Sequence, residues 1–471
     1  MPMTFQSLRN WAGASSIAIT AMVCSSGLHG QTLADAMVGA YNHTGLLQQN
    51  RALLRAADEN VAQASAALLP VLNWTADAQR TLGDSSSEFG TTQLESTSIS
   101  ASLIASWQIY DFGADAANIE SLRETVLATR AGLLALEQVI LLQAVTTFMN
   151  VRATSETVAI QRSNIRLLRE ELRAAQDRFE VGEVTRTDVS LAEAALAASV
   201  SDLAAAEGAF RQAREAYRVA VGVYPGTLSS PPPLPKLEGS IERAQKFAVQ
   251  NHPDMMEARH QVSAAELTIT QTQLAQKPVI SLNGSLSVSD ELGESGGVEN
   301  LTVGIGASGP IYQGGALDSI VRSAMAQRDA ARGNLHVVRH DVFADVGNAY
   351  ADLQAAFAQI DATEEQIRAA RVAFEGIREE AKLGARTTLD VLDAEQQLLD
   401  AQASRVSAEA SQYIAAYSVL SSMGLLTAER LKLPVQIYDA SAYYNVVKDG
   451  GVTRRSKQGQ QLDRVLRALN K

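Results

Sequence analysis

The chain has 471 residues, a formal net charge of −12 and a sequence pI of about 5.1. This acidic balance disfavours nucleic acid as a partner, because no basic stripe is available to neutralise phosphates. Apolar residues make up 46% of the chain but aromatic residues only 5%. Much of the apolar content is alanine and leucine, a mixture that suits closely packed helices better than a large aromatic core.

The first 30 residues have the pattern of a secretory signal peptide. Arg9 supplies a positive charge, Trp11 to Cys24 forms a short apolar run, and Gly30 precedes a predicted cleavage site near Gln31. A lipid attachment site at Cys24 is the alternative, which the bulky residues before it disfavour. Because Cys24 is the only cysteine, we expect no disulfide or thiol chemistry in the mature chain.

Strict alternation of apolar and polar residues predicts four strands, at about 71–81, 98–110, 279–289 and 301–311. Each has about the 10 residues that a tilted strand needs to cross a bilayer, and no unbroken run of 18 apolar residues follows the signal segment. Serine, threonine and glycine on the polar side suit a water-filled lumen, although a soluble sheet with one wet face is the alternative. The polar segments Gly83–Thr97 and Asp290–Asn300 are expected to be exposed hairpin loops.

Four strands cannot close a barrel of useful width, because barrel diameter grows with strand number. Three copies of the chain would supply twelve strands. The barrel interpretation therefore predicts a trimer, with lipid of a membrane around the apolar face of the strands.

The chain also contains an internal duplication. Residues 105–113 match 307–315 and residues 182–193 match 384–395, in both cases with an offset of 202 (307 − 105 and 384 − 182). Asn42-His43 also matches Asn251-His252. Each copy is predicted to run helix, strand, hairpin loop, strand, long helix, break, helix. The predicted divisions are a first repeat over 31–235, a second repeat over 236–430 and a C-terminal tail over 431–471, with a proline-rich joint at 231–235.

Two segments are unusually long for globular helices. Ala114–Val181 and Ala316–Leu383 contain no proline, and as helices they would extend roughly 100 Å. An apolar stripe with alanine at close contacts predicts coiled packing. Such helices could form a tube that reaches away from a barrel.

The duplicated halves, the two Ile-Tyr-x-x-Gly strand ends (109–113 and 311–315) and the two Gly-x5-Asp-Val-x2-Ala-Glu segments resemble TolC-type outer-membrane factors. The match covers residues from about 31 to 430, and residues 384–396 most resemble the branch that serves type I protein secretion. The fold class that this resemblance implies is mainly α with a membrane β-barrel. Duplicated long coiled helices would form a periplasmic tunnel, and four strands per subunit would form a twelve-stranded barrel in a homotrimer.

The function that the resemblance implies is a passive outer-membrane exit channel of a tripartite export system. A periplasmic adaptor protein and an inner-membrane ABC or proton-driven transporter would be the partners, and type I protein secretion is favoured. The outer-membrane component of a drug or metal efflux pump is the alternative. A soluble periplasmic adaptor or a coiled-coil structural protein fits less well, because neither explains the duplication with paired strands.

In the family, charged residues close the tip of the tunnel. Carried onto this sequence, Asp390 and Asp393 would form the constriction, and Arg386 would tie to Asp188 in the other repeat, in a neighbouring subunit. Spacing i, i+3 puts both carboxylates on one helix face, and crowded acids select cations. Gly182 and Gly384 would break the helices at the two turns.

Helix capping is the alternative role for two of these acids. Thr185-x-x-Asp188 and Thr387-x-x-Asp390 each fit a capping box, so both acids could simply start their helices. Asp393 is the better candidate for the constriction, because the other repeat has leucine in its place. The family's best-known lock has tyrosine three residues before the motif glycine, where this chain has Ala381, which predicts a weaker closure.

Other chemistry is not indicated. The six histidines show no ligand spacing with cysteine or acids, so no metal site is predicted. No nucleophile motif or phosphate loop is present, so we expect neither enzyme activity nor a cofactor. The C-terminus has the pattern of a small amphipathic helix, which could dock on the outside of the tube or be disordered, with apolar positions Leu462, Val465, Leu466 and Leu469.

Overall fold

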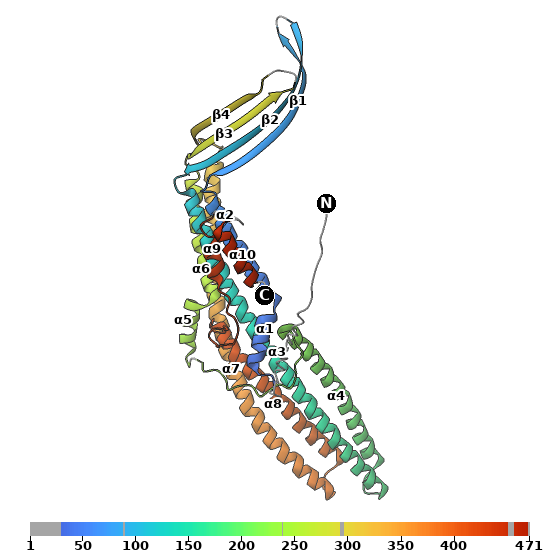
Figure 1. Cartoon of the computed structure of the whole chain (residues 1–471). Coiled ribbons are helices and arrows are strands. Elements are labelled where there is room, and N and C mark those ends of the chain that lie inside the picture. The colour runs from blue at the N-terminus through green and yellow to red at the C-terminus, as the bar shows by residue number, and fades with distance from the viewer. Residues whose placement is uncertain (1–29, 88–89, 238, 293–295, 451–455, 470–471) are drawn as a thin grey trace, which may run out of the picture.

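The computed structural model describes residues 30–87, 90–237, 239–292, 296–450 and 456–469. The predicted signal peptide, apart from Gly30, lies outside these residues. The chain is a long, slender molecule, with a curved sheet at one end and helices running to the other (Figure 1). The backbone of Gln31 forms a parallel bridge with Leu228, near the end of the first repeat.

The two repeats fold into the same sequence of elements. The first contains α1 (Leu33–His43), α2 (Gly45–Ala66), β1 (Val71–Ser87), β2 (Gly90–Tyr110), α3 (Ala114–Glu180) and α4 (Arg186–Val221). The second contains α5 (Ile241–Asn251), α6 (Pro253–Leu274), β3 (Val279–Glu291), β4 (Val298–Ser308), α7 (Ala316–Lys382) and α8 (Thr388–Ser422). The tail adds α9 (Ala440–Val447) and α10 (Lys457–Leu469).

The duplication extends to individual residues after the hairpins, where α3 and α7 both have 67 residues and start 202 positions apart (316 − 114). Before the hairpins the offset is 208 (279 − 71), because the second hairpin is six residues shorter. The match of Asn42-His43 with Asn251-His252 is therefore one residue out of register. The structure instead pairs Thr44 with His252, since each caps the second helix of its repeat through its side chain.

The four strands form one antiparallel sheet in the order β1-β2-β3-β4. The register places Trp74 opposite Leu103, Leu103 opposite Leu286, and Leu286 opposite Leu301. Because side chains alternate between faces along a strand, this alignment gathers the apolar residues of all four strands on one face. Serine, threonine and asparagine share the other face.

The first hairpin is longer than the sequence pattern indicates. Gly83–Thr97 was expected to be a loop, but β1 continues to Ser87 and β2 begins at Gly90. Polar residues can extend a ladder where both faces meet water, because the ladder itself satisfies the backbone groups. Arg80 and Glu95 form an ion pair across the two strands in this region.

Two other strand boundaries also differ from the prediction. The segment expected at 301–311 begins earlier, at Val298, and ends at Ser308. The residues that follow are Gly309 and Pro310, and proline has no N–H to donate to a ladder. Ile311, which was assigned to the strand by its alternation, lies fully exposed beyond the end of the strand.

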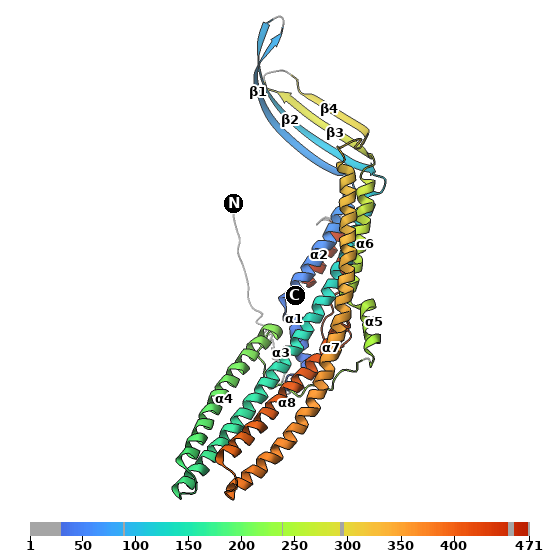
Figure 2. The ribbon, with the colours of Figure 1, turned by 180° about the vertical axis from the view of Figure 1, so that it is seen from behind.

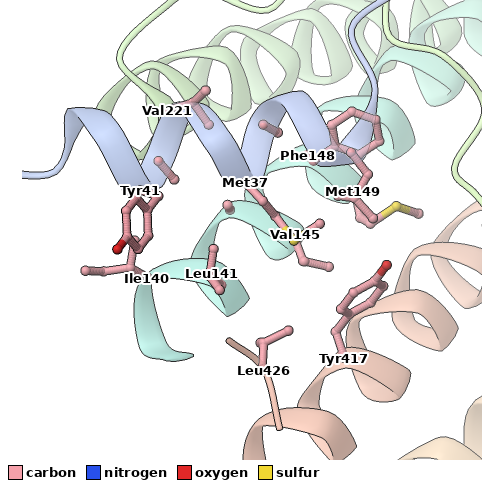
Figure 3. Close-up of a cluster of buried hydrophobic side chains, with 14 of the residues drawn as sticks. Met37, Tyr41, Ile140, Leu141, Val145, Phe148, Met149, Val221, Tyr417 and Leu426 are labelled. Atoms are coloured by element: carbon pink, nitrogen blue, oxygen red, sulfur yellow. The ribbon is translucent and has the colours of Figure 1, made fainter. Parts of the chain in front are cut away.

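The largest apolar core lies midway along the helices (Figure 3). It joins Met37 and Tyr41 of α1 to Phe148 of α3, Tyr417 of α8 and Leu426 beyond α8. Toward the sheet, α2, α3, α6 and α7 form the wall. Toward the far end, α7, α8, α3 and α4 lie side by side in that order (Figures 1 and 2). The core therefore lies at the level where α8 and α4 replace α2 and α6 beside the long helices α3 and α7.

The C-terminal tail docks on α2 and α3 (Figure 1). Of the two alternatives expected from the sequence, docking and disorder, the structure shows docking. In α10, Leu462, Val465 and Leu466 pack toward Ala62 and the buried α9 residues Tyr443 and Val447. Hydrogen bonds strengthen the attachment. The Tyr443 hydroxyl donates to a Glu59 carboxylate oxygen at 2.5 Å, and the Ser65 hydroxyl donates to the Lys448 carbonyl at 2.9 Å.

Among the described residues, α3 and α4 each contain an 18-residue window that is long and apolar enough to cross a membrane by length and composition alone. Neither window is an unbroken apolar run, so the sequence pattern did not predict them. Both helices are rich in alanine and pack along each other as a pair. Half of the α3 window is buried inside the structure but only 11% of the α4 window, and two such windows are weak evidence for a membrane span.

Candidate channel tip and exposed sheet

Two matching turns form the end of the molecule that lies farthest from the sheet (Figures 1 and 2). Gly182 ends α3 and Gly384 ends α7, with φ of 80° and 76°. In the second turn the Ala385 N–H donates to the Glu380 carbonyl at 2.9 Å, which closes the last turn of α7. Glycine suits both positions, because a left-handed backbone strains any residue with a Cβ.

The start of the next helix is capped in the same way in both copies. The Thr387 hydroxyl accepts from the Asp390 N–H at 3.2 Å, and the Thr387 N–H donates to the Asp390 carboxylate at 2.9 Å. Thr185 and Asp188 repeat this pattern at 3.3 and 2.8 Å. The backbone hydrogen bond from Thr387 lowers the pKa of Asp390, and the Thr185 hydroxyl lowers that of Asp188. Both acids are therefore helix caps, and a second role for Asp390 in a constriction stays a prediction.

Asp393 has a different environment. It is exposed on α8, one turn after Asp390, and it makes no hydrogen bond or ion pair with the described residues. The matching residue of the first repeat, Leu191, is half-buried on α4. No local contact therefore explains the acid at 393, and its role in a constriction stays a prediction.

Arg386 pairs within its own chain. Its Nε donates to a Glu380 carboxylate oxygen at 2.8 Å, across the turn, and this bond raises the pKa of Arg386. Asp188, the predicted partner, is bonded to Thr185 instead. The predicted Arg386–Asp188 tie joins two subunits, so it stays a prediction, with Glu380 as the competing partner inside one chain.

A buried acid near the tip was not identified from the sequence. Glu395 on α8 is only 4% exposed, and neither of its carboxylate oxygens has a hydrogen-bond partner among the described residues. Burial raises its pKa to about 7; the nearby carboxylate of Glu171 adds to the rise, and the guanidinium of Arg378 opposes it. Comparison of the repeats could not single out this residue, because the matching position, Glu193, is also glutamate.

The apolar face of the sheet lies in the open. Trp74 is 75% exposed and Ile305 72%, and other large apolar side chains beside them are also exposed, including Leu72, Leu301 and Val303. Contiguous apolar surface of this kind is rare on water-soluble monomers and indicates contact with lipid or protein. β1 and β4 each have one unpaired edge within the sheet.

The comparisons with known proteins agree with this geometry. The family of outer membrane efflux proteins matches residues 40–223 and 246–425, once in each repeat. The outer membrane efflux protein BepC of Brucella suis is 31% identical over 432 residues, which cover 91% of this chain and 93% of BepC. The chain belongs to the outer membrane efflux protein family.

Two more distantly similar proteins match over most of this chain. TolC of Vibrio cholerae is 24% identical and aligns with 90% of this chain and 96% of its own. The structure of the CmeC outer-membrane channel of Campylobacter jejuni superposes with a TM-score of 0.74 at 16% identity, covering 95% of this chain and 98% of CmeC. The resemblance to TolC-type factors is confirmed, and so is the fold of long helices with four antiparallel strands. The chain is an outer-membrane protein.

Ala381, where the resemblance places a tyrosine in one family member, lies near the tip. It is buried at the end of α7 against Val391 and Ala394 of α8, in a small cluster with Phe374. A small side chain fits this close packing between α7 and α8. The weaker closure expected from it stays a prediction.

Proposed function

We propose that three copies of this chain form one passive exit channel, with a twelve-stranded barrel in the outer membrane and a helical tunnel in the periplasm. The observation that carries this proposal is the sheet. It has one continuous apolar face that is exposed and two open edges, at β1 and β4. Pairing β1 of one copy with β4 of the next would satisfy the edge groups over the length that the two strands share, which a strand in lipid requires.

The helical wall supports the same arrangement. Its outer helices toward the tip are α4 and α7. Both expose large apolar side chains, namely Val200 and Val219 on α4 and Phe357 and Val372 on α7. Contact between α4 of one copy and α7 of the next would cover these residues and close the wall into a tube.

Closure at the tip would bring the candidate constriction together. With threefold symmetry, Asp390 and Asp393 of three subunits would place six carboxylates around one axis, which attracts cations and opposes anions. Arg386 would then pair with either Glu380 of its own chain or Asp188 of a neighbouring subunit. The second pairing would hold the tip shut, so its loss is the expected opening event.

A passive channel needs partners to supply energy. We propose a periplasmic adaptor at the tip and an inner-membrane ABC or proton-driven transporter behind it. Type I protein secretion is favoured by the segment 384–396. The name of BepC, an outer membrane efflux protein, favours the second candidate, the outer-membrane component of a drug or metal efflux pump.

Two measurements test this function. The mass of the detergent-solubilised full chain, by native mass spectrometry, should equal three subunits, and heating should convert a trimer band to a monomer band on a gel. A mass of one subunit would refute the channel. Deleting the gene should remove a protein from the culture medium if secretion is right, whereas increased sensitivity to toxic small molecules alone would favour the efflux pump.

A further inference from the structure

A hollow lies in the seam between α3 and α8, near the tip, where the helical pair of one repeat meets that of the other. Its volume is about 310 Å³, and its walls include Asn164, Leu167, Leu398 and Gln402. α8 also lies between α3 and α7 along this stretch (Figure 2). Glu395 lines this hollow and is itself buried in the seam.

The charges around Glu395 balance only when this carboxyl is neutral. From α7, Arg378 Nε contacts a carboxylate oxygen of Glu171 on α3 at 2.8 Å, so these two charges cancel. Arg166 and Glu170 of α3 also line the hollow and carry opposite charges. An ionised Glu395 therefore adds one uncompensated negative charge to a site largely removed from water, which is unfavourable.

The other repeat shows that the fold does not require a buried acid here. Glu193, the matching residue of α4, is exposed. The two helices thus carry the same residue at the same helical position, buried in one copy and solvated in the other. Within one chain the difference arises because α8 lies inside the wall while α4 lies at its edge, where the proposed tube would place α7 of the next copy.

We propose that Glu395 is a proton-dependent latch on the seam between α3 and α8. The protonated carboxyl lets the α3–α4 and α7–α8 pairs close against each other, and the ionised carboxylate favours their separation, which admits water to it. The proposal deepens the proposed function, since it assumes that the tip of the channel opens by parting these pairs. The raised pKa of Glu395, about 7, places the transition near neutral pH.

Thermal unfolding of the full chain tests the latch without any assumption about channels. The pKa of Glu395 is higher in the folded chain than its ordinary value of 4.5, so the folded state loses stability as pH rises from about 4.5 to 7. Glu395→Gln and Glu395→Met should melt near the wild type at pH 5 and above it at pH 8.5. Glu193→Gln, the matched control, should follow the wild type at both. An equal difference in Tm between Glu395→Gln and the wild type at both pH values would overturn the latch.

Conductance of the purified protein in a planar bilayer tests the coupling to opening. The open fraction of the wild type should rise severalfold between pH 6 and pH 8, the rise should be absent in Glu395→Gln, and Glu193→Gln should retain it. An unchanged rise in Glu395→Gln would overturn the coupling. A preparation that forms no pores at all would count against the proposed function instead, while the melting experiment would still decide on the latch.

Discussion

Thr387 and Asp390 bond to each other reciprocally at the start of α8, side chain to backbone in both directions. Thr185 and Asp188 do the same at the start of α4. The shared pattern shows that the two turns at the tip have a common local structure, whatever further role one of them has. An effect of capping should therefore be seen at both turns, whereas an effect of the constriction should be seen only at the second turn.

The cap gives the first prediction. Thr387→Ala should lower the local stability of the α8 start by about 1 kcal/mol, because an N-terminal N–H group loses its acceptor. Hydrogen exchange of the Asp390 and Val391 amides should accelerate about fivefold. Thr388→Ala is the control, since the Thr388 side chain makes no hydrogen bond among the described residues. Equal exchange in both variants would show that the cap does not stabilise the helix.

The second prediction concerns the left-handed glycines. Gly384→Ala should destabilise the turn by about 1 kcal/mol, because φ is 76° there. Limited proteolysis after Lys382 and Arg386 should become faster. Gly208→Ala, in the interior of α4 with open space around its Cα, should leave the cleavage rate unchanged or slow it. Slower cleavage in Gly384→Ala would contradict the structure of this turn.

The proposed constriction gives the third prediction. Asp390→Ala with Asp393→Ala should raise the conductance of the trimer and abolish block by divalent cations, because the carboxylates that bind the cations are gone. Single-channel recording measures both effects. Asp35→Ala, the control, removes the acid of the matching capping box at the start of α1, away from the tip, and should leave conductance and cation block intact. If conductance and block persist in the double variant, these residues do not form the constriction.

The fourth prediction tests which acid pairs with Arg386, Glu380 of its own chain or Asp188 of a neighbouring subunit. Cysteines placed at 386 and 188 should form disulfides between subunits, giving dimer and trimer bands on a non-reducing gel. Cysteines at 386 and 202 are the control, because Asp202 lies on α4 far from its start. If the 386/188 variant gives monomer bands alone, Glu380 is the partner of Arg386 and the proposed lock between subunits is wrong.

The tail gives a fifth prediction, with a pH dependence. Asp58 is fully buried, 3.9 Å from Arg130, whose guanidinium also stacks on Tyr444. Burial raises the pKa of Asp58 to about 6, and Arg130 opposes the rise. Arg130→Ala should cost about 3 kcal/mol where Asp58 is ionised, because an unpaired charge stays buried. As the raised pKa favours the protonated form, the loss should shrink as pH falls below 6.

Thermal melting at pH 8 and pH 5 measures this effect. Arg368→Ala provides the control, since Arg368 pairs with the exposed Glu365 on α7 and should matter little at either pH. A loss in Arg130→Ala that is the same at both pH values would show that Asp58 is not the group responsible.

The sequence predicted features that depend on periodicity and repetition. The offset of 202 located α3 and α7, and alternation located the apolar face of the strands, because both patterns follow from backbone geometry. It did not predict the extended first hairpin, since polar residues on both faces resemble a loop. It also missed the pairing of Arg386 with Glu380, which depends on the path of the turn between them.

Glu395 shows a different limit. Its repeat partner is the same residue, so comparison of the copies gave no reason to distinguish them. Burial at this position depends on which helix lies inside the wall, and that follows from the packing of α8 between α3 and α7. Tertiary arrangement, rather than local pattern, decides where an acid becomes sensitive to pH.

The conductance of the purified wild-type chain in a planar lipid bilayer tests the central claim most directly. An exit channel built from a closed barrel and tunnel predicts discrete steps of uniform size, reduced by divalent cations. A protein that associates with the bilayer yet produces no steps would contradict the account.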